Sequence, residues 1–151
     1  MAAIRLTETE IRAWQALLHA HHELVRRLDE ELREIHGVTF AEYDVLLRLA
    51  RAPGRALRMG DLADRVLLSP SGITRLVDRM IAKKLLRRET DPTDGRVALA
   101  TLTEEGLRLV RLAARTHLRG IRQHFSGRLS DPQLRAVASA LETIVGPHTP
   151  H

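Results

Sequence analysis

The sequence predicts a mostly α-helical chain with one small β-hairpin in its middle third. Capping boxes mark the expected starts of several helices, and the apolar residues after each box recur at steps of three and four positions. Two short alternating stretches flank the turn-forming segment TDPTDG. Before this hairpin, MGDLADRVLLSPSGITRLVDRM indicates a short helix, a tight turn and a longer helix. A hairpin directly after a helix-turn-helix is a wing, so we predict a winged helix-turn-helix between longer terminal helices.

The first expected helix starts at a capping box of Thr7 with Glu10, and Gly37 ends it. Its apolar stripe has the spacing of a coiled-coil seam, with one polar member, His21. The stripe comprises Ile11, Trp14, Leu18, His21, Val25, Leu28, Leu32 and Ile35.

The second expected helix starts at another capping box, Thr39 with Glu42, and the segment RAPGRA ends it. Its predicted buried face consists of Tyr43, Leu46, Leu47 and Ala50. In the helix-turn-helix that follows, Ala63 is the small residue that lets the two helices cross closely. The apolar positions expected in its core are Leu62, Val66, Leu68, Ile73, Leu76, Val77 and Met80. Ser69 is the expected N-cap of the second helix, with Pro70 at its first position.

The expected wing pairs LLRRE with RVALATL, and Asp94-Gly95 is the predicted turn dipeptide. Thr103 is then expected to cap a long helix. The stripe of this helix comprises Leu107, Val110, Ala114, His117, Ile121 and His124. A last helix begins at a capping box of Ser130 with Gln133 and carries Leu134, Val137, Leu141 and Ile144 on one face.

The chain of 151 residues suits a single domain, but the two terminal stripes are too long for one small lobe to cover. We therefore expect a homodimer joined through residues 7–36 and 103–146, with residues 39–102 forming the winged helix-turn-helix lobe. No cysteine is present, which excludes disulfides, thiolate metal sites and thiol-based redox switches.

The beginning of the chain, MAAIRLTETE, lacks the apolar run of a secretory signal. No stretch of the sequence approaches the roughly 20 apolar residues of a membrane span. We therefore expect a cytoplasmic protein with no membrane partner.

Positive charge is concentrated in the middle of the chain. Residues 51–100 hold 11 Lys/Arg against 6 Asp/Glu, whereas the two flanks together hold 13 of each. A basic block between neutral flanks indicates a polyanion partner, most simply double-stranded DNA. The alternative is a solvated charged surface, in which each arginine pairs with a neighbouring carboxylate.

The second helix of the helix-turn-helix leaves small polar residues and arginines on its outer side: Ser71, Gly72, Thr74, Arg75, Asp78 and Arg79. Hydroxyls and the N-terminal amides of a helix can meet phosphates, and arginine can read guanine edges in a major groove. Arg96 on the wing can enter a narrow minor groove, with nearby Asp94 holding its guanidinium.

Nothing in the sequence indicates an enzyme or a cofactor. A Gly-rich phosphate loop, a nucleophile elbow and a His-Glu-x-x-His motif are all absent from it. The alternative function is a metal-sensing regulator, or a small metalloprotein, that uses His21 and His117. A zinc site would have to be assembled from Glu23 and the helical histidines His19, His21, His22, His117 and His124. The spacing of these residues does not favour such a site, and we expect no metal.

The segments LADRVLLSPSGITRLVDRM, LLRRETDPTDGR and ALATLTEEG resemble the MarR family of bacterial transcriptional regulators. The resemblance covers about residues 7 to 145. It implies a triangular homodimer whose two winged lobes read a pseudo-palindromic DNA site, most commonly as a repressor. It also implies DNA contacts at Ser69, Ser71, Gly72, Thr74, Arg75 and Arg79, and at the wing residues Asp94 and Arg96. Gly95 stands where many members have a second wing arginine.

Many members of this family release DNA when a small phenolic or other anionic compound enters a cleft between stem and lobe. Since His21 and His117 interrupt the apolar stripes of two helices expected to pack together, one or both could donate to such an effector. Trp14 or Tyr43 would supply an aromatic wall. The alternative is that both histidines are neutral core residues. Members that sense oxidants use cysteine, which this chain lacks.

Overall fold

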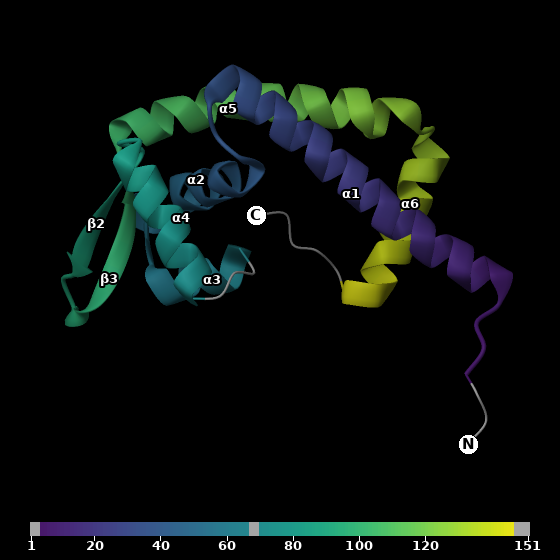
Figure 1. Ribbon diagram of the computed structural model, residues 1–151, viewed down its shortest axis with the longest axis horizontal. Coiled ribbons are helices and arrows are strands. Elements are labelled where there is room, and N and C mark those ends of the chain that lie inside the picture. Colours follow the sequence, from purple (N-terminus) through teal and green to yellow (C-terminus); the bar gives the residue numbers. More distant parts are fainter. Residues whose placement is uncertain (1–3, 67–69, 147–151) are drawn as a thin grey trace.

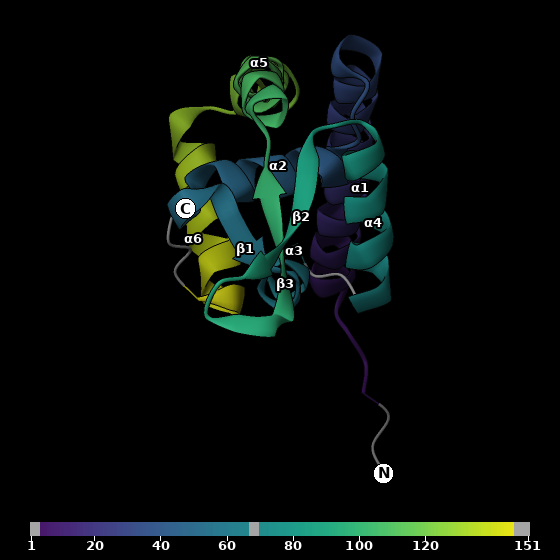
Figure 2. The ribbon, with the colours of Figure 1, turned by 90° about the vertical axis from the view of Figure 1, so that its left-hand side faces the viewer.

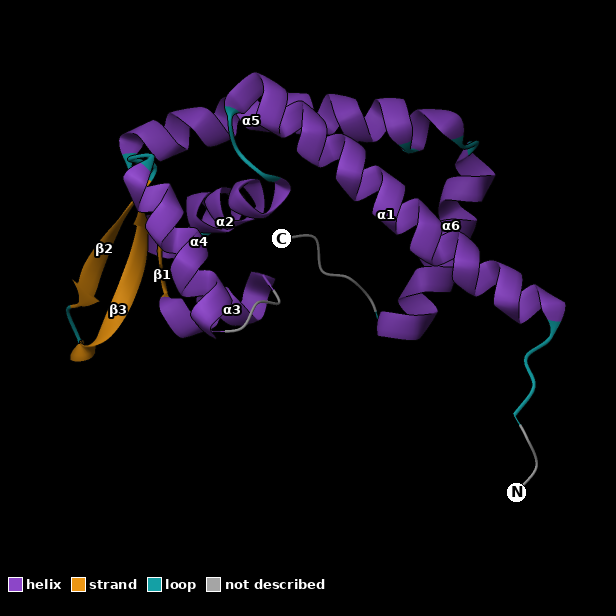
Figure 3. Ribbon diagram, in the orientation of Figure 1, coloured by secondary structure: helices purple, strands orange, loops and turns teal. Residues whose placement is uncertain are grey.

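Residues 4–66 and 70–146 are described in the computed structural model of the chain, in which helices predominate and three strands form one sheet. The first part contains α1 (Glu8–His36), α2 (Phe40–Arg51), the 3-10 turn η1 (Pro53–Arg55), β1 (Ala56–Arg58) and α3 (Met59–Val66). The second part contains α4 (Pro70–Ala82), β2 (Leu86–Asp91), β3 (Asp94–Leu102), α5 (Glu104–His124), η2 (Ser126–Arg128) and α6 (Asp131–Val145). Figures 1 and 3 show α2, α3, α4 and the sheet gathered in one lobe, from which α1, α5 and α6 extend.

The predicted starts of α1, α2, α5 and α6 are confirmed, because each depends on residues only three positions apart, whereas the Ser69 cap predicted for α4 lies outside the described residues. At the start of α1, the Thr7 backbone N–H donates to the Glu10 carboxylate (2.7 Å), and the Glu10 N–H donates to the Thr7 hydroxyl (3.2 Å). Capping boxes of the same kind begin α2 and α6. The Thr103 hydroxyl caps α5 by accepting from the Gly106 N–H at 3.0 Å.

The sheet has the order β1-β3-β2, and all its pairs are antiparallel. Strand β1 was not predicted, since the segment RAPGRA was expected only to end a helix. Three residues are too few to show an alternating pattern, and the strand exists because Leu57 pairs with Ala100 of β3 and is buried. Figure 2 shows β1 beside β3 beneath α2.

The prediction that Asp94-Gly95 forms the hairpin turn is wrong. Pro92 and Thr93 form the turn, and Asp94 and Gly95 already belong to β3. The Asp91 carboxylate accepts from the Thr93 backbone N–H (2.8 Å) and the Thr93 hydroxyl (2.7 Å), which closes the turn two residues earlier. A register shift between Thr90 and Asp91 accompanies this tighter turn.

The lobe core follows the predicted helix-turn-helix closely. Leu62, Ala63, Ile73, Leu76, Val77 and Met80 are all buried, whereas Val66 is half-buried and Leu68 lies outside the described residues. On α2, Tyr43 and Leu46 are buried as predicted, but the other buried apolar residues are Val45 and Leu49. Leu47 and Ala50 are only half-buried, because α2 turns a different edge toward the sheet and α5 than the sequence pattern indicated.

The stem helices are covered over only part of their length. Leu28 and Leu32 of α1 pack against α5 and are buried, and a side chain at Gly120 would collide with Leu28. Farther toward the N-terminus, Trp14 is 59% exposed and Leu18 is 50% exposed. The last helix also leaves an apolar face uncovered, formed by Leu141, Ile144 and Val145. The buried line of α5 is likewise shifted from the predicted stripe and includes Ala113, Thr116 and Gly120.

Candidate nucleic-acid interface

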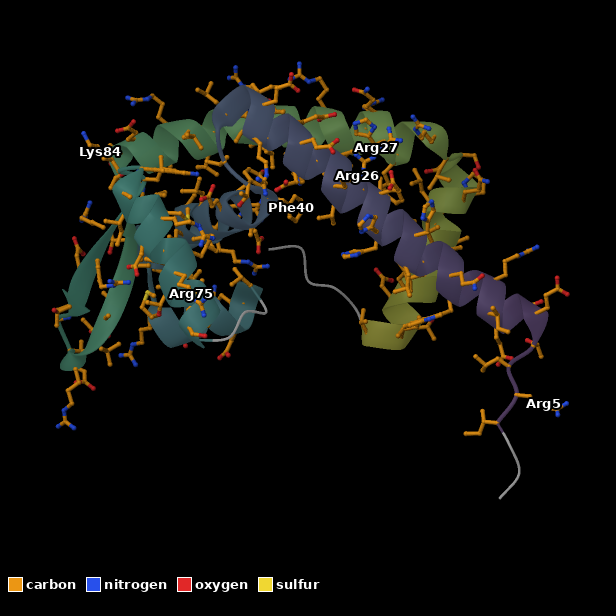
Figure 4. The ribbon with its side chains drawn as sticks, viewed as in Figure 1. Arg5, Arg26, Arg27, Phe40, Arg75 and Lys84 are labelled. Atoms are coloured by element: carbon orange, nitrogen blue, oxygen red, sulfur yellow. The ribbon has the colours of Figure 1, made fainter. Side chains whose placement is uncertain are left out.

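Helix α4 has one apolar, buried face and one polar, exposed face, so it is part of the core and also offers a surface for recognition. Its inner residues Ile73, Leu76, Val77 and Met80 are at most 2% exposed. Its outer residues Ser71, Thr74, Arg75, Asp78 and Arg79 are exposed. Gly72 is half-buried, and Ser69 lies outside the described residues. Figure 4 shows Arg75 in the lower part of the lobe, away from α5.

The two arginines on this face, and Arg96 on the wing, have no carboxylate partner within the described residues. Within the described residues, Arg75, Arg79 and Arg96 form no ion pair, and the Arg75 Nε lies 3.4 Å from the carbonyl of Ser71 on its own helix. The acidic Asp78 on the same face pairs with Arg88 of β2 at 2.9 Å. The outer face of α4 therefore keeps its cations available and its one carboxylate neutralised, so the solvated-surface alternative does not describe these three arginines.

The wing is fastened by Asp91, which sequence reasoning missed. This 7% exposed carboxylate accepts from Thr93 and from the Arg58 guanidinium of β1 at 2.9 Å. Hydrogen bonds from Thr93 and the charge of Arg58 lower the pKa of Asp91. The ion pair between Arg58 and Asp91 could not be predicted from the sequence, because the two residues are 33 positions apart.

Asp94 does not hold the guanidinium of Arg96 as expected. Its carboxylate instead accepts from the backbone N–H of Arg96 at 3.1 Å. This bond shapes the strand after the turn and leaves the Arg96 side chain exposed at the wing. The difference follows from the turn itself, because Asp94 begins β3 and is not the turn residue that was predicted.

The C-terminal end of α4 is tied to the corner between α1 and α2. The Lys83 ammonium donates to both carboxylate oxygens of Glu42 (2.8 and 2.9 Å) and to the carbonyl of Gly37 (3.0 Å). Glu42 is only 1% exposed and also serves as the capping-box residue of α2, accepting from the Thr39 N–H at 2.9 Å. One ammonium thus connects the end of α1, the start of α2 and the end of α4.

The four residues expected to bind an effector do not come together in the chain. The His117 ring lies in tilted contact with Tyr43, with ring centroids 4.8 Å apart, and with Phe40 at 5.8 Å. Burial lowers the pKa of His117, and its Nδ1 is buried with no hydrogen-bond partner in the described part of the chain. Trp14 and His21, however, lie on the exposed N-terminal half of α1.

Two further histidines lie where α1 meets α5. The His124 Nε2 is 2.5 Å from a carboxylate oxygen of Glu31, and the His36 Nε2 is 2.8 Å from the Thr116 hydroxyl. Among residues 4–66 and 70–146, no group of three or more His, Asp and Glu side chains is arranged to hold a metal ion. None of the helices in these ranges is both long and apolar enough to cross a membrane.

Comparison with known proteins assigns this architecture to a family. The MarR family model matches residues 36–97, which include the whole helix-turn-helix and the hairpin turn. The regulator MhqR of Bacillus subtilis is 30% identical over 105 residues, covering 70% of each chain.

Two solved structures from Streptomyces coelicolor are similar over nearly their whole length. AbsC is 34% identical with a TM-score of 0.88, covering 95% of this chain and 96% of AbsC. Sco3205, solved in complex with DNA, is 30% identical with a TM-score of 0.89, covering 99% of this chain and 93% of Sco3205. AbsC and Sco3205 are MarR family transcriptional regulators. The chain, with its winged helix-turn-helix lobe and long stem helices, belongs to the MarR family of transcriptional regulators.

Proposed function

We propose that this regulator binds a pseudo-palindromic DNA site as a homodimer and represses transcription there. Helix α4 of each subunit enters a major groove, where Arg75 and Arg79 meet base edges or phosphates. Arg96 on the wing enters the adjacent minor groove. Backbone or hydroxyl contacts to phosphates come from Ser71 and Gly72 in the first turn of α4, from Thr74 in its second turn and from Ser69, which precedes the helix in sequence.

The observation that carries this proposal is the two-sided α4. Four of its apolar residues fix it in the core, and its opposite face offers arginines that no carboxylate within the described residues neutralises. A helix held by one face and cationic on the other fits a groove without rearrangement. Sco3205, which shares the fold at 30% identity, was solved in complex with DNA.

The test is a salt-controlled mobility-shift assay on DNA fragments recovered from chromatin by the tagged protein. Arg96→Ala should weaken binding to every fragment, whereas Arg75→Ala should also relax base preference, each by about 1–3 kcal/mol. Arg135→Ala is the matched control, since this arginine lies on α6 and pairs with Asp131 of its own helix. Equal affinities for all four proteins would refute these roles.

Pairing of two chains is supported by the uncovered apolar surface of the stem. Ile11, Trp14 and Leu18 of α1 are 43%, 59% and 50% exposed, and Ile144 of α6 is 73% exposed. A stripe of this size at both ends of one chain fits a large apolar subunit interface. Sedimentation should give a dimer, and deletion of residues 1–18 should give aggregated or unfolded protein. A soluble, folded monomer after that deletion would contradict the dimer.

We further propose that an anionic aromatic effector releases the DNA, with His117 as its donor and Tyr43 as an aromatic wall. Two observations support this assignment: the Nδ1 of His117 has no hydrogen-bond partner within the described residues, and the His117 ring contacts the Tyr43 ring. Any part for Trp14 and His21 then requires the partner subunit, because within one chain they lie on the uncovered half of α1. His117→Gln should blunt DNA release by a panel of aromatic carboxylates. Identical responses of wild type, His21→Gln and His117→Gln would end the effector proposal.

A further inference from the structure

Helix α5 carries a second group of arginines, on the side of the helix that faces away from the lobe. We call it the α5 arginine face, and it consists of Arg108, Arg111, Arg115, Arg119 and Arg122. All five are exposed, and they follow one another at steps of three and four residues. At 3.6 residues per turn they share an arc of about 80°, on the side opposite the buried residues of α5. The rise of an α-helix makes this line about 21 Å long.

This face contains almost no negative charge. The acidic residues of α5 are Glu104 and Glu105 in its first turn, and Glu104 pairs with Arg55 at 2.8 Å. Within the described residues, none of the five arginines forms an ion pair, and Arg119 only approaches the Thr116 hydroxyl at 3.4 Å. Like charges at these spacings destabilise a helix, so the arrangement has a cost that an anionic partner would remove.

Several arginines elsewhere in the stem are paired. Arg26 pairs with Glu23 and Glu30, and Arg135 pairs with Asp131. The outer surface of the winged lobe and the α5 arginine face each hold a group of arginines that form no ion pair within the described residues. The first group is the proposed contact with DNA. The second group also consists of exposed arginines without ion pairs, so it is equally suited to bind phosphates.

The two groups face opposite directions. The buried side of α5 packs on α1 and α2, so its arginine face points away from the lobe. Figures 1 and 2 agree that α5 lies along the upper edge of the molecule, whereas α3 and the tip of the hairpin lie at the lower edge. A duplex held by α4 cannot reach α5, so any polyanion on the arginine face is a second one.

The face is also hollowed near its N-terminal end. Glu104, Leu107, Arg108, Arg111 and Leu112 line a depression of about 410 Å³. Leu112 is 50% exposed and forms an apolar wall beside the two guanidinium groups. The Glu104 carboxylate in this lining is paired with Arg55 at 2.8 Å, so the two guanidinium groups can donate to a phosphate while its sugar contacts the leucine.

We propose that the α5 arginine face binds the backbone of a second DNA duplex, so that one dimer holds two duplex segments on opposite sides. The proposal rests on the function proposed above for the first duplex. The backbone of DNA fits this face better than an acidic protein does. The face is an unbroken line of five positive charges, which matches a continuous row of phosphates. It offers no carboxylate that could pair with the basic residues of a protein partner. Binding is independent of sequence, since the proposed contacts are to phosphates, which carry no sequence information.

The experiment is a two-duplex capture at about 50 mM salt, where phosphate contacts are strong. One duplex is fixed to beads and loaded with protein, and a fluorescent duplex of unrelated sequence is then added. The variant Arg108→Gln/Arg111→Gln/Arg115→Gln removes three charges from exposed positions. Arg26→Gln/Arg27→Gln/Arg135→Gln removes three from paired, exposed positions and is the matched control.

Wild type and control should both capture the fluorescent duplex. The α5 variant should bind the bead duplex normally but capture at least tenfold less of the second, with a circular dichroism spectrum like that of wild type. Equal capture by the α5 variant would overturn the proposal, because the intact lobes alone would then bridge the duplexes. Capture of fluorescent polyglutamate in place of DNA would overturn it in favour of an acidic protein partner.

A second variant tests the DNA-binding roles of α4 and the wing separately from the α5 proposal. The variant Arg75→Ala/Arg96→Ala should lose sequence preference on the bead duplex while its α5 face still retains a duplex at low salt. If that variant binds the bead duplex like wild type, the roles of α4 and the wing are wrong, whatever the α5 variant does.

Discussion

Replacing Lys83 with methionine should be among the most damaging single changes outside the apolar core. The ammonium of Lys83 is the cationic partner of Glu42, whose side chain is 1% exposed. Methionine keeps the length of the side chain but has no charge and no donor. The change therefore leaves a buried carboxylate without its counter-charge and the carbonyl of Gly37 without its lysine donor.

The expected cost is about 3 kcal/mol of unfolding free energy. Breaking a buried ion pair by removing one partner costs about 3–5 kcal/mol. The lower end applies because the Lys83 side chain is 41% exposed, so water screens the pair and reaches the vacated site. For a chain of this size, about 3 kcal/mol corresponds to a fall in Tm of roughly 6–12 °C.

Urea titration and thermal melting at one fixed protein concentration measure this loss. Lys84→Met is the matched control, since Lys84 is the exposed neighbour and its side chain has no carboxylate partner in the described residues. The double variant Lys83→Met/Glu42→Gln should be more stable than Lys83→Met alone, because glutamine still accepts from Thr39 and buries no charge. A loss below about 0.5 kcal/mol for Lys83→Met would refute the reasoning.

Three further predictions concern single positions. Gly106→Ala should cost about 1–3 kcal/mol in a urea titration, because its Cβ would lie 2.3 Å from the carbonyl oxygen of Leu85, and no loss would contradict this close approach. Lys84→Gly should stabilise the chain by roughly 0.5–1 kcal/mol, since Lys84 has φ of 62° at the end of α4; a loss would contradict strain there. Burial lowers the pKa of His36 and His117 in the folded chain. As the pH falls below about 6.5, the ordinary pKa of histidine, these two residues bind protons in the unfolded chain before they do so in the folded chain. Unfolding free energy should therefore fall as pH drops from 7 to 5, less so in His117→Gln, and a flat profile would contradict the burial.

Local signals in the sequence predicted most of the fold. Each capping box joins residues three positions apart, so its geometry is present in the sequence itself. The apolar spacing of α4 likewise identified its buried and exposed faces, and with them Arg75 and Arg79. These features depend on helix periodicity and on contacts within one turn.

What the sequence missed depends on contacts between distant segments. β1 is a strand only because β3 lies beside it. Asp91, whose carboxylate closes the hairpin turn, is also bound by Arg58, 33 positions earlier. The tie between Lys83 and Glu42 spans 41 positions. Interactions of this kind form only when the chain has folded, and they produce no periodic pattern in the sequence from which they could be predicted.

The uncovered apolar surfaces of α1 and α6 have a consequence for synthesis of the protein. The two surfaces lie at opposite ends of the chain, so the ribosome releases the first long before it has made the second. A nascent α1 carries Trp14 and Leu18 with neither α6 nor a second chain complete beside it. It is then a target for chaperones that hold exposed apolar segments. Assembly of the proposed dimer must wait for finished chains, so its rate rises with the square of their concentration in the cell.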